Sequence, residues 1–222
     1  MDALADALVG LSTIEGRHSL RSQIADALRA ALISGKMRPG VVYSAPALAE
    51  EFGVSPTPVR EAMIDLVKDD LVEAVRNRGF RVRPLSANDL DELLELRELL
   101  EVPAVTALAG AIPDTAAARL RELAEEIVAE AEKGDLVRYV DADQRFHSEL
   151  LALRGNQTLV RTVMQLRNRS RLYGLANLSA RSELATAACE HGELLDALLA
   201  GDAGKAEEII RRHLGHVRSD WA

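Results

Sequence analysis

The stretch from Ser44 to Pro84 constrains the fold of this chain more than any other part of the sequence. Its first half holds two short helix-like segments separated by Gly53-Val54-Ser55, where the glycine can take a positive φ and the serine can cap a second helix. Its second half alternates apolar and polar residues over 71–75 and 80–83, around the turn Arg76-Asn77-Arg78-Gly79. Two helices joined by a tight turn and followed by a two-stranded hairpin make a winged helix-turn-helix, which we predict for this segment.

The helices of this segment have recognisable ends. Apolar residues at helical spacing predict a preceding helix over about 19–34, which Gly35 terminates. Ser44 is expected to cap the next helix, and Ser55 the one after it. That last helix should end near Asp69, with an apolar face formed by Val59, Met63 or Ala62, Leu66 and Val67.

The exposed side of this unit carries residues suited to nucleic acid. In a helix-turn-helix the second helix enters the major groove with its N-terminal residues on base edges, and an arginine-tipped wing can contact the backbone or minor groove. The candidate DNA-binding residues are Ser55, Thr57, Arg60, Arg76, Arg78 and Gly79. The alternative is a winged helix used for protein contacts, with the arginines as solvated surface. We favour DNA binding because three separate basic features converge.

The charge distribution agrees with a DNA-binding unit joined to a different one. The whole chain of 222 residues has a net charge of −8, but residues 17–83 hold 11 Lys/Arg against 8 Asp/Glu, whereas residues 84–222 hold 16 against 24. Phosphate binding acts over a contact range that salt screens beyond about 10 Å, so a locally basic surface is sufficient. A single cysteine and the lack of a long apolar run predict a cytoplasmic protein without a membrane segment.

The rest of the chain has the pattern of a helical bundle. After a predicted linker at 85–88, apolar residues recur at helical spacing in about six segments separated by short Gly, Pro and Asp breaks. We therefore expect a mainly α protein with an N-terminal arm at 1–16, a winged helix-turn-helix with a small β-hairpin wing at 17–84, and an antiparallel bundle of about six helices at 89–222.

Four metal-ligating side chains fall on three of the predicted bundle helices. Asp143 and His147 are four residues apart and share a helix face, while His191 and His213 lie on two later helices. One carboxylate and three imidazoles suit a divalent metal of borderline character. His216 could replace His213 as a ligand, because both lie near the same turn; His18 is expected to be an ordinary surface residue.

Two resemblances to known families sharpen these expectations. ALAEEF-GVSPTPVREAM-DLVKDDLVEAVRNRGFRV, together with the upstream RSQIADALRAALISGKMRPG, resembles the DNA-binding domain of GntR-type bacterial transcription regulators. Where that family usually has an arginine, this chain has Pro56, so the implied groove-reading role falls on Thr57 and Arg60, and the wing role on Arg78 and Gly79.

Residues 89–217 resemble the FCD effector domain of one GntR branch, through LRELLE, DQRFH and EHGELLDALLAGDAGKAEEIIRRH. The resemblance implies that Asp143, His147, His191 and His213 bind a divalent metal, with zinc expected first and nickel or manganese as alternatives. It also implies that Arg97 faces a small organic acid bound at the metal.

Three functions are compatible with these features. The first is a homodimeric, ligand-responsive regulator that binds a double-stranded, near-palindromic DNA operator. The second is a regulator for which the metal ion itself is the signal. The third is a metal-dependent hydrolase with Glu190 or Glu149 as general base, but it lacks a motif such as His-Glu-x-x-His and leaves the winged helix unexplained. We predict the first, without enzymatic activity.

Overall fold

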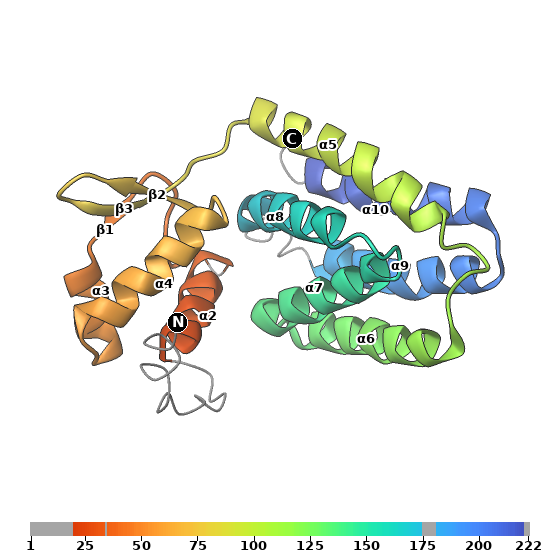
Figure 1. Cartoon of the computed structure of the whole chain (residues 1–222), viewed down its shortest axis with the longest axis horizontal. Coiled ribbons are helices and arrows are strands. Elements are labelled where there is room, and N and C mark those ends of the chain that lie inside the picture. Colours follow the sequence, from red (N-terminus) through yellow and green to blue (C-terminus); the bar gives the residue numbers. More distant parts are fainter. Residues whose placement is uncertain (1–19, 34, 175–180, 220–222) are drawn as a thin grey trace, which may run out of the picture.

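The computed structural model describes residues 20–33, 35–174 and 181–219, which form two domains joined by a short extended link (Figure 1). The predicted arm at 1–16 and His18 lie outside these residues. Within the described chain the predicted fold class is confirmed, because a winged helix-turn-helix with a small sheet precedes a bundle of six helices.

The N-terminal domain packs three helices against a small sheet. The recognition helix of the predicted helix-turn-helix is α4, and its inner face is fully buried. That face consists of Val59, Ala62, Met63 and Leu66. The elements are α2 (Leu20–Ile33), β1 (Val42–Tyr43), α3 (Ala45–Phe52), α4 (Pro56–Lys68), β2 (Val72–Val75) and β3 (Gly79–Val82).

Helices α3 and α4 both begin after a serine, but only the serine before α3 caps its helix through a side-chain hydrogen bond. The Ser44 side chain accepts a hydrogen bond from the Ala47 amide at 3.2 Å, and Gly53 ends α3 with φ 64°, both as predicted. Ser55 occupies the cap position of α4, but its side chain makes no capping hydrogen bond. The predicted side-chain cap is therefore wrong. The nearby prolines explain part of this, since Pro56 and Pro58 have no amide hydrogen to donate.

The wing has one strand more than predicted. Its antiparallel sheet has the order β1-β3-β2, with Val42 opposite Arg81 and Tyr43 opposite Phe80. The close approach of β1 also explains Gly79, whose φ is +133° and where an added Cβ would lie 2.2 Å from the Tyr43 carbonyl oxygen. Gly79 therefore has a backbone role in shaping the wing.

The C-terminal domain is an antiparallel bundle in which α6 packs against α7 and α9, and α5 packs against α10 and α8. A capping box between Ser86 and Asp89 starts its first helix, two residues before the predicted end of the linker. Pro103 lies inside that helix. The helices are α5 (Ala87–Thr106), α6 (Asp114–Lys133), α7 (Leu136–Ala152), α8 (Gln157–Gly174), α9 (Arg181–Leu199) and α10 (Ala203–Ser219).

The two domains meet along α8 and α7, which contact α2 (Figure 1). Within the described residues, no helix combines the length and the apolar character that crossing a membrane requires.

Candidate metal centre and nucleic-acid interface

The four predicted metal ligands converge inside the bundle. Asp143 and His147 lie on the buried face of α7, while α9 supplies His191 and α10 supplies His213. One potential ligand atom from each lies within 4.8 Å of the other three. The first three side chains are at most 2% exposed and that of His213 is 10% exposed. The four residues that the sequence placed on three helices therefore form one compact cluster in the folded chain.

The distances inside this cluster suit a metal ion. His147 Nε2 lies 3.1 Å from His191 Nε2, which lies 3.2 Å from Asp143 Oδ1. His147 Nε2 lies 3.8 Å from Asp143 Oδ2. Ligands placed tetrahedrally around zinc, with bonds of about 2.0–2.1 Å, are separated by about 3.3 Å. The donor set and its spacing thus fit zinc or a similar divalent ion.

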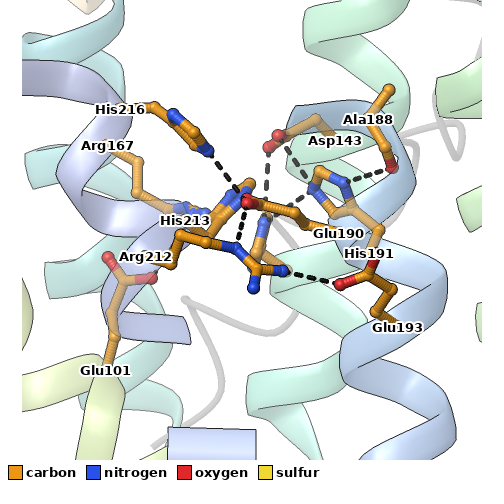
Figure 2. Close-up of polar contacts among 11 residues, drawn as sticks. Glu101, Asp143, Arg167, Ala188, Glu190, His191, Glu193, Arg212, His213 and His216 are labelled. Atoms are coloured by element: carbon orange, nitrogen blue, oxygen red, sulfur yellow. Dashed lines mark hydrogen bonds and ion pairs between the residues drawn. The ribbon is translucent and has the colours of Figure 1, made fainter. Parts of the chain in front are cut away.

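Neighbouring groups fix the orientation of two of the imidazoles. His191 Nδ1 is 3.1 Å from the Ala188 carbonyl oxygen, and His213 Nδ1 is 3.1 Å from Glu190 Oε2 (Figure 2). A carbonyl and an ionised carboxylate can only accept, so both Nδ1 atoms carry the hydrogen and both Nε2 lone pairs are left for a metal.

Burial keeps the rings of His147 and His213 neutral. Burial lowers the pKa of His147 well below its ordinary value, and the positive charge of Arg167 lowers it further. Burial also lowers the pKa of His213 from 6.5 to about 3, although the hydrogen bond with Glu190 acts in the opposite direction. Neutral imidazole is the form that ligates metals, so burial holds His147 and His213 in the form that can bind a metal.

His216, the alternative ligand, lies outside the cluster of four residues and contacts Glu190. Its Nε2 lies 2.9 Å from Glu190 Oε1 (Figure 2). The same oxygen accepts from Arg212 Nε at 2.6 Å. Burial alone would raise the pKa of Glu190, but hydrogen bonds from His213, His216 and Arg212 outweigh it and keep this pKa well below its ordinary value. Glu190 therefore remains an anion that supports the cluster from outside.

A buried group of charges adjoins the metal ligands. Arg97 Nε donates to Glu101 Oε1 at 2.7 Å and its Nη1 donates to Ser170 Oγ at 3.2 Å. Arg167 Nη1 donates to the other oxygen of Glu101 at 3.3 Å. Two guanidinium groups thus share one carboxylate, and the Arg167 Nε and Nη2 atoms are buried without a hydrogen-bond partner among the described residues.

Unsatisfied buried donors are costly, so these two nitrogens mark a place suited to an anion. Burial lowers the pKa of Arg167 to about 9, which leaves it a cation at neutral pH. The predicted effector residue Arg97 lies in this group, but its observed partners are Glu101 and Ser170. Arg167 was not among the residues predicted from the sequence. A helical pattern in the sequence could have identified Arg167, because it shares the buried face of α8 with Val160, Val163 and Ser170.

The predicted DNA-binding residues lie on two exposed features of the N-terminal domain. Ser55, Thr57 and Arg60 are exposed at the start of α4, and Arg76 and Arg78 are exposed at the tip of the wing. The start of a helix favours anions through its free amides and its dipole. These positions therefore form one candidate surface with two contact points.

These three arginines differ from others in the same domain. The side chains of Arg60, Arg76 and Arg78 have no hydrogen bond or ion pair with any other described residue. In contrast, four arginines of this domain are bound to acidic residues, through the pairs Arg21–Asp65, Arg29–Asp69, Arg81–Glu73 and Arg83–Asp70. Uncompensated positive charge is thus present at the start of α4 and on the wing, and Arg38, in the loop after α2, also has no side-chain partner among the described residues.

Comparisons with known proteins agree with this two-domain arrangement. Residues 20–82 match the model of the family described as bacterial regulatory proteins, gntR family, and residues 92–216 match the FCD domain. A probable D-xylose utilization operon transcriptional repressor of Paenarthrobacter nicotinovorans is 31% identical over 205 residues, covering 89% of this chain and 87% of that protein. The solved structure of E. coli McbR/YncC superposes with a TM-score of 0.74 at 29% identity, covering 88% of this chain and 93% of that one.

Proposed function

The chain belongs to the GntR family of bacterial regulatory proteins and is a DNA-binding transcription regulator with an FCD domain, and we propose that a small carboxylate effector bound beside a divalent metal controls its affinity for its operator. The relatives reported above, the Paenarthrobacter repressor and McbR, are transcription regulators, so we assign regulation rather than metal-dependent hydrolysis to this chain.

One observation carries the effector proposal: a buried cluster of three histidines and one aspartate adjoins an arginine with two unsatisfied nitrogens. Asp143, His147, His191 and His213 would hold the metal. A metal there would supply a Lewis-acidic centre with positions left for a carboxylate oxygen. Arg167 would donate from Nε and Nη2 to the bound acid, since these two atoms have the fork geometry that carboxylates accept.

Arg97 completes this anion site as we propose it. Its bond to Glu101 orients that carboxylate, which in turn holds Arg167. Burial and the charge of Arg167 lower the pKa of His147 more than the charge of Arg97 does, but Arg97 acts in the same direction. The two arginines together would favour an anionic effector over a neutral one.

At the other end of the molecule, α4 and the wing would bind the operator. Thr57 and Arg60 would enter the major groove, with Ser55 at the adjacent DNA backbone. Arg76 and Arg78 would contact the phosphates or minor groove, while Gly79 lets the wing keep its shape. We further propose a homodimer that binds a near-palindromic operator, since two-fold symmetry is the usual match between such proteins and their half-sites.

Helix α8 provides a physical route between the two sites. Arg167 lies on its buried face near the metal ligands, and Arg169, two residues later, pairs with Asp70 of the N-terminal domain. An acid bound by Arg167 would therefore act on the helix that contacts the DNA-binding domain. A change in the position of α8 is the coupling that we propose.

Native mass spectrometry with elemental analysis of the purified chain tests this proposal, followed by operator titrations with and without the acid that co-purifies. We expect a divalent metal, a bound carboxylic acid, and a change in operator affinity of about 5- to 150-fold on its addition. If the metal alone changes the affinity and no acid does so, the protein is a metal sensor. Tight metal binding without any effect on DNA binding would leave the metal with a structural role and contradict effector control.

A further inference from the structure

Glu190 lies directly before the metal ligand His191 on α9, yet it takes no part in the cluster. Neighbouring residues of a helix point about 100° apart, so the two side chains serve different neighbours. Glu190 is only 2% exposed. Its carboxylate points to α10, where it lies between the ring of His213 and the side chains of Arg212 and His216 (Figure 2).

We infer that Glu190 is a positioning residue for metal binding, which fixes the tautomer and the orientation of His213. Its Oε2 atom accepts the hydrogen of His213 Nδ1 at 3.1 Å, which leaves only Nε2 available to a metal. Because the partner is a carboxylate, the bond also makes the imidazole a stronger donor. The inference rests on the metal site proposed above but concerns a residue outside the ligand set.

The three histidines differ in how firmly they are held. His191 has a backbone carbonyl as its Nδ1 partner, at 3.1 Å. His147 Nδ1 is buried and has no hydrogen-bond partner among the described residues. The Nδ1 partner of His213 is a side chain outside the ligand set, so this contact can be altered by mutation without changing a ligand.

The other contacts of Glu190 keep its carboxylate in place. Arg212 Nε and His216 Nε2 both bond Oε1, at 2.6 and 2.9 Å, and leave Oε2 to His213. The two carboxylate oxygens of Glu190 therefore have different partners. Oε1 ties α9 to α10, and Oε2 orients the metal ligand.

The test is zinc binding by the full chain in competition with a chelator. Glu190→Ala should lower zinc affinity about 10- to 100-fold, as loss of such outer partners does elsewhere. Glu190→Gln keeps an oxygen that can accept from His213 and should restore part of the affinity. Glu193→Ala is the matched control, since Glu193 bonds the same Arg212 at 2.6 Å, is exposed, and does not contact His213.

A second measurement separates positioning from a merely structural role. Nitrogen-15 NMR of the metal-free protein reports which ring nitrogen of His213 carries the hydrogen. We expect the Nδ1–H form in the wild type and in Glu193→Ala, and a mixture in Glu190→Ala. If Glu190→Ala does not fold, Glu190→Gln decides, because its amide can also donate and should add the other tautomer.

Unchanged zinc affinity and an unchanged His213 tautomer in the Glu190 variants would overturn this inference while leaving the metal site intact. A wild-type chain that binds no zinc would instead overturn the metal site. The tautomer measurement needs no metal, so the two failures are distinguishable.

Discussion

Arg169 and Asp70 join the two domains through an ion pair, with Arg169 Nε 3.0 Å from Asp70 Oδ2. Asp70 lies in the turn between the recognition helix α4 and strand β2, where it adopts a positive φ of 59°. The other carboxylate oxygen of Asp70 lies 3.2 Å from Nη1 of Arg83, the residue that follows strand β3 of the wing. One aspartate thus connects α8 to both elements that we expect to contact DNA.

Removing this ion pair should weaken the coupling between the domains. In Arg169→Ala we expect the effect of the co-purifying acid on operator affinity to shrink several-fold, with metal content unchanged. The side chains are partly exposed, so the pair contributes at most about 1 kcal/mol to folding. Operator titrations with and without the acid measure the effect. Arg161→Ala, an exposed arginine of the same helix, is the control. Full coupling in Arg169→Ala would exclude this pair as the route.

Loss of one metal ligand should remove both the metal and the stability that it provides. In His191→Ala we expect elemental analysis to find little metal in the purified protein, and a weakened response to the acid. Zinc at 100 times its dissociation constant adds about 2.7 kcal/mol to wild-type stability by mass action. Thermal unfolding with added zinc should therefore shift the wild type upward but not the variant.

His216→Ala is the control for that experiment, because His216 bonds Glu190 and lies outside the ligand set. It should retain the metal. Equal metal content in His191→Ala and the wild type would place the ion elsewhere.

The metal-free protein should lose stability as the pH falls from 7 to 5. The folded state holds His213 neutral, with its pKa lowered from 6.5 to about 3. The unfolded chain takes up a proton below pH 6.5, so acid favours unfolding until the folded ring also protonates near pH 3. The expected slope is at most about 1.4 kcal/mol per pH unit for each such imidazole.

Denaturant unfolding in the presence of a chelator measures this dependence. His213→Asn can still donate to Glu190 but has no imidazole to titrate. Its free energy of unfolding should fall less steeply than that of the wild type over the same pH range. Equal slopes would show that His213 is protonated to the same extent in both states.

Features set by neighbouring residues could be predicted from the sequence. Ser44 and Gly53 delimit α3 as expected, because a cap and a left-handed residue depend on local chain geometry. The four side chains of the predicted metal site could also be named, since their spacing on amphipathic helices places each on a buried face. The family resemblance then singled out His213 over His216.

Features set by distant contacts could not be predicted. Strand β1 has only two residues, and it exists because Val42 and Tyr43 pair with β3 almost 40 residues away. The partners of Glu190 and Arg167 depend on how α10 and α5 pack, which no local pattern encodes. Ser55 has the composition of a capping residue, but its side chain is not used as one.

The role of α4 in DNA binding is tested most directly by selecting binding sites from a random duplex library with the intact chain and titrating the selected duplex by anisotropy. We expect a near-palindromic site, and a loss of affinity of about 5- to 150-fold in Arg60→Ala. The exposed Arg154→Ala in the helical domain should bind as the wild type does. Failure to enrich any sequence, or equal affinity of Arg60→Ala and the wild type for the selected duplex, would contradict the assignment of α4 as the DNA-reading helix.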